Sequence, residues 1–203
     1  MPRRELTQDQ IDAFRAKAVD AATSMFATHG VDGVSMRRLA AAIGCSAMTP
    51  YRYFADRDEL FAMVRADAFR RFAEDQRAAF HAHAEPLERI GALREAYVAF
   101  ALREPDAYRI MFELAQRPAG HYPRLVQESR RAFGFLQEAV STAITTGALT
   151  GDPDTVAHLL WASVHGIVSL HLAGKLEMGP TLQQLSAQLH QLYPLPRSST
   201  PCA

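Results

Sequence analysis

Apolar residues recur at intervals of three and four along almost the whole chain, and glycine and proline fall between the periodic stretches. This spacing gathers apolar side chains on one face of a helix. Strands require strict alternation, and alternating runs of Val, Ile, Thr and Tyr do not occur. The pattern therefore predicts an all-α protein. The predicted helices span residues 8–29, 36–43, 47–53, 58–83, 87–102, 105–116, 123–146, 153–175 and 181–192.

Capping and helix-breaking residues set the boundaries of these helices. Ser35 stands before the second helix as an N-cap, Gly44 follows it as a C-cap, and Gly30 ends the first. Several later helices open with proline, whose missing N–H costs nothing in the first turn. Residues 194–203 combine three prolines with serines, which predicts a disordered tail.

Composition restricts the class of protein. The 203 residues include 22 Lys or Arg and 22 Asp or Glu, so the net charge is zero and a histone-like basic composition is excluded. Apolar residues make up 48% and charged residues 22%, as in soluble globular proteins. Cys45 and Cys202 cannot form a disulfide framework or a Cys-rich zinc site. The N-terminus lacks the apolar core of a signal peptide, so we expect a cytoplasmic protein.

One stretch has the length and polarity of a membrane span. Residues 155–174 contain no Asp, Glu, Lys or Arg, and 20 residues suffice to cross a bilayer as a helix. The stretch nevertheless includes three histidines and two serines. We expect a helix that is buried on all sides in a soluble protein, and no membrane partner.

Residues 35–54 are predicted to form a helix, a glycine turn and a second helix. Leu39 and Ile43 share the inner face of the first helix, and Tyr51 and Phe54 return the second to the core. This spacing is typical of a helix-turn-helix, whose second helix enters the major groove of DNA. Residues 34–57 include four arginines and one aspartate, a net charge of +3 that favours an anionic partner.

The same segment resembles the DNA-binding region of TetR-like transcriptional repressors. Matching residues occur in the family's order at Ser35, Arg37, Ala40, Gly44, Ser46, Thr49, Tyr51, Phe54, Arg57 and Leu60, and Gly30 matches the glycine that closes the family's first helix. The resemblance implies a helix-turn-helix domain over residues 1–57. It also implies a larger helical domain for effector binding and dimerisation over residues 58–193. A helical hairpin that only packs is the alternative.

The resemblance also implies roles for residues in and around this motif. Contacts with DNA phosphates are expected from Arg37, Thr49, Tyr51 and Arg57, because guanidinium and hydroxyl groups are good phosphate donors. Contacts with base edges are expected from Ser46, Ala47, Met48 and Arg52. Arg52 suits guanine, and the two apolar side chains suit a thymine methyl. Tyr53 is expected to contact either the DNA backbone or the core, and Arg38 to be a solvated surface charge.

Two residues depart from the family pattern. Cys45 replaces a valine, and it is either a small buried apolar residue or a redox-sensitive thiol. Pro50 stands where leucine is common, and it fits only within the first turn of the short helix, with Thr49 as the cap. The proline therefore predicts a shortened DNA-reading helix.

The C-terminal part carries a second signature. Trp161, His165 and Gly166 match the Trp-x-x-x-His-Gly pattern of one subgroup of TetR-like C-terminal domains. The family binds its effector inside this domain, which implies a pocket there. The aromatic and flexible side chains of this part of the chain favour a small, apolar, aromatic-containing molecule. The expected lining residues, none of them strongly charged, are Tyr97, Phe100, Tyr108, Met111, Phe112, Trp161 and His165. The alternative is that Trp161 and His165 form a purely structural pair.

Small residues follow one face of the predicted helix 153–175. Ala162, Gly166, Ser169 and Ala173 stand at i, i+4, i+7 and i+11, and the other faces are apolar. Such a stripe lets a second helix approach closely and predicts a homodimer interface, which helix 123–146 would complete as a four-helix contact. A helix in the core of a monomer is the alternative.

Other function classes find less support in the sequence. Gly-x-Ser-x-Gly, Gly-x-Gly-x-x-Gly and phosphate-loop motifs do not occur, so we expect no enzyme and no cofactor. His81 and His83 lie on different sides of a helix, and His158 and His165 lie roughly 10 Å apart along one, so neither pair suits a shared metal ion. A helical protein-binding adaptor is the remaining alternative. The sequence predicts a homodimeric repressor that binds a palindromic operator in double-stranded DNA and is released by a small-molecule effector.

Overall fold

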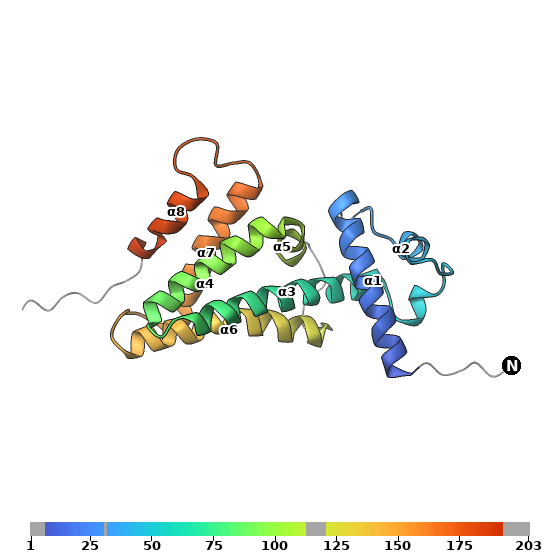
Figure 1. The fold of residues 1–203 in the computed structure, drawn as a ribbon, viewed down its shortest axis with the longest axis horizontal. Helices are drawn as coiled ribbons and strands as arrows, with labels where there is room; N and C mark the ends of the chain where they lie inside the picture. The colour runs from blue at the N-terminus through green and yellow to red at the C-terminus, as the bar shows by residue number, and fades with distance from the viewer. Residues whose placement is uncertain (1–6, 31, 113–120, 193–203) are drawn as a thin grey trace, which may run out of the picture. The chain divides into compact units, whose positions relative to one another are not determined.

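The computed structural model of the chain describes residues 7–30, 32–112 and 121–192. Eight α-helices occupy these ranges (Figure 1), and no strand occurs within them, which confirms the all-α prediction. The helices are α1 Gln8–His29, α2 Met36–Ile43, α3 Arg57–Ala82, α4 Pro86–Arg103, α5 Pro105–Phe112, α6 Pro123–Thr145, α7 Pro153–Leu172 and α8 Leu182–Gln188, with 3-10 helices η1 Pro50–Arg52 and η3 Leu189–Leu192. The predicted tail lies outside the described residues, as do residues 113–116 of one predicted helix.

Local capping explains why the first two helices begin and end where the sequence predicts. Thr7 and Gln10 form a capping box at the start of α1, in which each side chain accepts a hydrogen bond from the other residue's backbone N–H. Ser35 Oγ accepts a hydrogen bond of 3.2 Å from the N–H of Arg38 at the start of α2. Gly44 ends α2 in the left-handed conformation with φ of 73°, which favours glycine.

The chain divides into two compact units, residues 1–69 with 106–128 and residues 70–105 with 129–203. The core of the first unit gathers apolar side chains from α1, α2, the segment after α2, α3 and α5. Its buried members are Ala18, Val19, Ala22, Phe26, Val34, Met36, Leu39, Ile43, Phe54, Leu60, Phe61, Val64 and Ile110. These residues hold α2 and the segment that follows it against α1.

The second unit has a core of its own, drawn from α3, α4, α6, α7 and the loop between α6 and α7. Its buried members are Phe80, Ile90, Leu93, Ala139, Val140, Ala143, Leu149, Val156 and Ala157. Aromatic rings extend the packing in the same unit, where Phe72 lies edge-on to Tyr97 and contacts Phe100, both at 5.2 Å between ring centroids. Such pairs add about 0.5–1.5 kcal/mol beyond area burial.

Helix α7 buries only part of its surface within the chain. Val156, Ala157, Val164 and Val168 are buried, whereas Leu159 and Leu170 are exposed by 62% and 47%. Among the described helices, α7 alone is long and apolar enough to cross a membrane, a test that the core helix of a soluble protein also passes. The expectation of burial on all sides is therefore not met within a single chain, because the small residues of α7 face away from the core.

Candidate functional site

The segment between α2 and α3 is a series of tight turns. The N–H of Thr49 donates to the carbonyl of Ser46 at 2.9 Å, and those of Arg52 and Tyr53 donate to the carbonyls of Thr49 and Pro50 at 3.0 and 2.9 Å. The helix expected over residues 47–53 is reduced to η1, because Pro50 has no N–H to continue helical bonding. Thr49 does not cap η1 through its side chain, whose hydroxyl instead lies 2.8 Å from that of Ser46.

Most side chains expected to contact DNA are accessible to solvent around this segment. Met48 is exposed by 70% and Tyr51 by 51%. The exposed set also includes Arg37 on α2 together with Ser46, Ala47 and Arg52, while Thr49 is half-buried. The arrangement presents two guanidinium groups, several hydroxyl groups and two apolar side chains to a partner, which are the groups that bind phosphates and base edges.

Two residues of the expected DNA-contacting set pack against aromatic rings of the first unit. The ring of Tyr53 stacks on that of Phe14, with 3.8 Å between centroids and 15° between planes. The guanidinium of Arg57 lies over the ring of Phe61 at 4.9 Å, and Arg57 is half-buried. Tyr53 was expected to contact either the DNA backbone or the core, and its half-buried ring packs against the core of the first unit.

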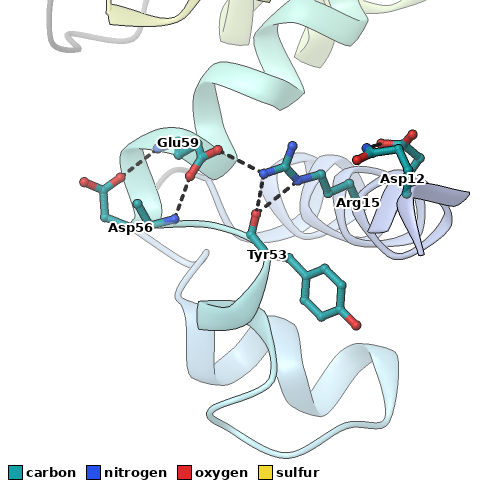
Figure 2. Close-up of polar contacts among 7 residues, drawn as sticks. Asp12, Arg15, Tyr53, Asp56 and Glu59 are labelled. Carbon is teal, nitrogen blue, oxygen red and sulfur yellow. Dashed lines mark hydrogen bonds and ion pairs between the residues drawn. The ribbon is translucent and has the colours of Figure 1, made fainter. Parts of the chain in front are cut away.

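Arg15 fixes the position of this segment, as Figure 2 shows. Its Nε and Nη2 atoms donate to the carbonyl oxygen of Tyr53 at 3.0 and 2.8 Å, and Nη2 lies 3.3 Å from a carboxylate oxygen of Glu59. The other oxygen of Glu59 accepts from the N–H of Ala55 at 2.6 Å, and Asp56 accepts from the N–H of Glu59 at 2.8 Å. One charged network thus ties together α1, the end of the segment between α2 and α3, and the start of α3.

Sequence reasoning missed Arg15. Asp56 and Glu59 are spaced as in a helix N-terminal cap, a signal that the sequence does contain. Arg15 offers no such signal, because its acceptor is a backbone carbonyl 38 residues away.

Two further basic side chains of the first unit bond to backbone carbonyls. Lys17 donates from Nζ to the carbonyl of Ile43 at 3.1 Å, which places a positive charge at the C-terminal end of α2. Arg38, expected to be a solvated charge, is exposed and donates to the carbonyl of Gly33 at 3.0 Å. Both bonds brace α2 and stabilise the surface that carries Arg37.

The residues expected to line an effector pocket fall in both units. Tyr108, Met111 and Phe112 belong to α5 in the first, whereas Tyr97, Phe100, Trp161 and His165 belong to the second.

In the second unit, a chain of polar contacts joins α4 to α7. The hydroxyl of Tyr97 lies 3.0 Å from Nδ1 of His165, whose Nε2 lies 3.3 Å from the hydroxyl of Ser169. The ring of Trp161 lies 6.0 Å from that of His165. The contact between Tyr97 and His165 therefore holds α4 against α7.

A cavity of about 40 Å³ lies in the second unit between α3, α4, α6 and α7. Its apolar wall is formed by Ile90, Leu93, Leu136, Leu160 and Val164, together with the rings of Tyr97 and Trp161. Gln76 and Arg94 also line it. Sequence reasoning missed these two residues. On a long amphipathic helix, the sequence pattern does not distinguish a polar residue that lines a cavity from one on the solvent-exposed face.

The outward side of α7 carries small and apolar residues, and we call it the α7 outer face. It consists of Leu159, Ala162, Gly166, Ser169, Leu170 and Ala173, all exposed or half-exposed. A Cβ atom built on Gly166 would meet nothing within 4 Å in this chain. Within the described residues, no three His, Cys, Asp or Glu side chains lie close enough to hold a metal ion.

Comparisons with known families match both parts of the chain. A family model described as bacterial regulatory proteins of the tetR family matches residues 18–64. A second, described as the C-terminal domain of tetracyclin repressor-like proteins, matches residues 90–192. The two matches cover the described segment around α2 and η1 and the helices α4 to α8.

Individual relatives extend over most of the chain. HTH-type transcriptional regulator Rv1816 of Mycobacterium tuberculosis is 25% identical over 198 residues, which covers 83% of this chain and 84% of the relative. A solved structure of a protein with unknown function from Rhodococcus sp. RHA1 has a TM-score of 0.77 and 26% identity, and covers 94% of this chain and 96% of that one. The structure of AibR in complex with isovaleryl coenzyme A and operator DNA has a TM-score of 0.68 at 20% identity, and covers 88% and 96%.

Proposed function

Because the chain belongs to the TetR family of bacterial regulatory proteins and is a DNA-binding transcriptional regulator, we propose that it acts as a homodimeric repressor on a palindromic operator. The observation that carries the proposal is the exposed, positively charged segment around α2 and η1 in a chain of zero net charge. One such segment per chain requires two chains to read a two-fold symmetric site.

The exposed groups make two kinds of contact with DNA in this proposal, one with phosphates and one with base edges. Arg37, Thr49, Tyr51 and Arg57 bind phosphates and so fix the register on the duplex. Ser46, Ala47, Met48 and Arg52 approach base edges, and Arg52 supplies the strongest discrimination, because a guanidinium can donate two hydrogen bonds to guanine. Tyr53 contributes by stacking on Phe14, which positions the backbone of the segment.

The α7 outer face is the dimer contact in this proposal. Leu159 and Leu170 are exposed in the single chain, and the small side chains between them leave room for a helix of a second copy. Helix α6 completes a four-helix interface. Burial of this face by a second copy also explains why a helix without a charged residue from position 155 onward is compatible with a soluble protein.

Regulation by a small molecule completes the proposed function. We place the DNA-binding domain at residues 1–57 and the effector-binding and dimerisation domain at residues 58–193, in the cytoplasm. AibR, a structural neighbour, was solved with isovaleryl coenzyme A and operator DNA, which supports control by a small-molecule effector. The effector must bind better to the conformation that does not fit the operator, and its effect cannot exceed that difference in affinity.

Gel-shift titration against the DNA that flanks the protein's own gene tests this function. A repressor should shift a fragment with a two-fold symmetric sequence, lose affinity steeply as salt rises, and sediment as a dimer. Unrelated DNA of equal length is the control. A protein-binding adaptor would shift both fragments equally weakly or not at all, and that result would refute the proposal.

A further inference from the structure

Arg94 is a nearly buried cation at the cavity of the second unit. Its side chain is exposed by only 14%, and its Nε atom is buried with no acceptor among the described residues. Nη2 lies 3.4 Å from a carboxylate oxygen of Glu95, the next residue in the chain, which is exposed by 75%. An exposed carboxylate at this distance is screened by water and compensates a buried charge weakly.

Other arginines of the same unit are paired more closely. Arg71 lies 2.9 Å from Glu104, and Arg103 lies 2.6 Å from Asp75. Burial of a charged group without a hydrogen-bonded partner is costly. The contact of Arg94 with Glu95 is longer and exposed to water, so the described part of the chain offsets the desolvation of Arg94 only weakly, at a wall otherwise made mostly of apolar side chains.

We propose that Arg94 binds the carboxylate of an amphiphilic effector whose hydrocarbon part lies among Leu93, Leu136, Leu160 and Trp161. The inference rests on the proposed effector function and names the chemical class of the effector. A guanidinium binds a carboxylate through two parallel hydrogen bonds, and this pairing gains strength where water is excluded. Gln76 adds a polar group to the same wall, and its amide donates to the carbonyl of Leu93 at 3.3 Å.

The size of the cavity connects binding to regulation. About 40 Å³ admits a carboxylate group or a few water molecules, but not the hydrocarbon of an amphiphile. The hydrocarbon must therefore displace side chains of α6 and α7, so the effector selects a conformation with a larger cavity. Helix α3 carries Gln76 at the cavity and begins at Arg57, directly after the DNA-binding segment, so it is the element that both sites share.

Titration of the full-length protein with paired ligands tests the assignment. The probes are straight-chain carboxylates from butanoate to dodecanoate and the primary alcohols of equal length, followed by emission of Trp161, the chain's one tryptophan. We expect at least one carboxylate to bind about tenfold more tightly than its alcohol, because only the carboxylate compensates Arg94. Arg94→Gln should bring the carboxylate to the affinity of the alcohol, and Arg94→Lys should give an intermediate preference.

A matched control and a second measurement keep the test decisive. Arg89 is on the same helix but lies over the ring of Phe80 and donates to the carbonyl of His83, so Arg89→Gln should keep the preference for carboxylate. Arg94→Met should raise the melting temperature of the ligand-free protein, since it removes a buried charge that Glu95 compensates only weakly. A purely structural arginine would lower it. Equal affinity for carboxylate and alcohol, an unchanged preference in Arg94→Gln, or no response to any carboxylate would each overturn the assignment.

Operator binding, measured in parallel, separates this inference from the proposed function. If a carboxylate binds through Arg94 and leaves the operator bound, the head-group assignment stands and the effector role fails. If only uncharged apolar compounds release the operator, repression stands and the carboxylate assignment fails.

Discussion

The hydroxyl of Tyr97 and Nδ1 of His165 lie 3.0 Å apart and join α4 to α7. Tyr97→Phe removes this hydrogen bond and keeps the ring that packs on Phe72. We expect the free energy of unfolding to fall by about 1 kcal/mol, a typical net value for one hydrogen bond. Urea titration measures it, and Ser169→Ala, which loses the longer contact of 3.3 Å, should cost less. A stable Tyr97→Phe variant that loses its effector response would instead assign the hydroxyl to the ligand.

Arg15→Met should destabilise the DNA-binding segment. The variant loses two charge-assisted bonds to the carbonyl of Tyr53 and the contact with Glu59. Hydrogen bonds of this kind contribute about 1.5–3 kcal/mol to the free energy of unfolding. Arg15→Lys should retain part of this contribution, since lysine keeps the positive charge but lacks the paired N–H donors of the guanidinium. Denaturant unfolding gives the stability, and operator titration should show weaker binding although Arg15 is not expected to contact DNA. Unchanged values in both assays would mean that the network does not position the segment.

Gly166→Leu tests the α7 outer face as a dimer contact. A Cβ atom at this position meets nothing within 4 Å in its own chain, and the neighbouring face of α7 is exposed or half-exposed, so the fold of the monomer should survive. The added volume should weaken self-association, because overpacking of a close contact costs about 1–3 kcal/mol. Sedimentation measures it, with Ala99→Leu on an exposed part of α4 as the control. A Gly166→Leu variant that dimerises like the parent would exclude this face.

The stability of the protein should depend on pH through Asp152 at the start of α7. Its carboxylate accepts hydrogen bonds from the hydroxyl and N–H of Thr155 at 2.7 and 2.9 Å, which hold the pKa of Asp152 below its ordinary value. The stabilisation is therefore fully present above about pH 4 and declines as the pH falls through the lowered pKa.

Asp152→Asn keeps an acceptor for the cap but does not titrate, so its unfolding free energy should fall less steeply in acid than that of the parent. Thr155→Val should weaken the same dependence. Thermal unfolding at a series of acidic pH values measures the stability of both variants and the parent. The same loss of stability with falling pH in all three proteins would contradict this role of the cap.

The helix boundaries could be predicted because capping residues lie next to the helices that they end. Parts of the candidate site could not be predicted, because they depend on contacts between residues far apart in the sequence. Ser35 and Gly44 define α2 through bonds to residues within a few positions, so its bounds follow from the sequence. Pro50 predicted a shortened helix. Its reduction to a single 3-10 turn also depends on the backbone hydrogen bonds of the whole segment between α2 and α3, which the sequence does not reveal. Arg15 acts on a distant carbonyl, and Arg94 lines a cavity only because four helices meet there. Sequence periodicity does not distinguish such residues from solvated charges.

Salt dependence of operator binding by arginine variants tests the central claim most directly. Arg37→Ala should weaken binding to all sequences and reduce the slope of log affinity against log salt by about one for each chain, since it removes a phosphate contact. Arg52→Ala should cost about 1–3 kcal/mol on the operator and less on unrelated DNA. Arg77→Ala, roughly 30 Å further along α3 than Arg57, is the control and should bind like the parent. If Arg37→Ala and Arg52→Ala also bind like the parent, the segment around α2 and η1 is not the DNA-binding surface.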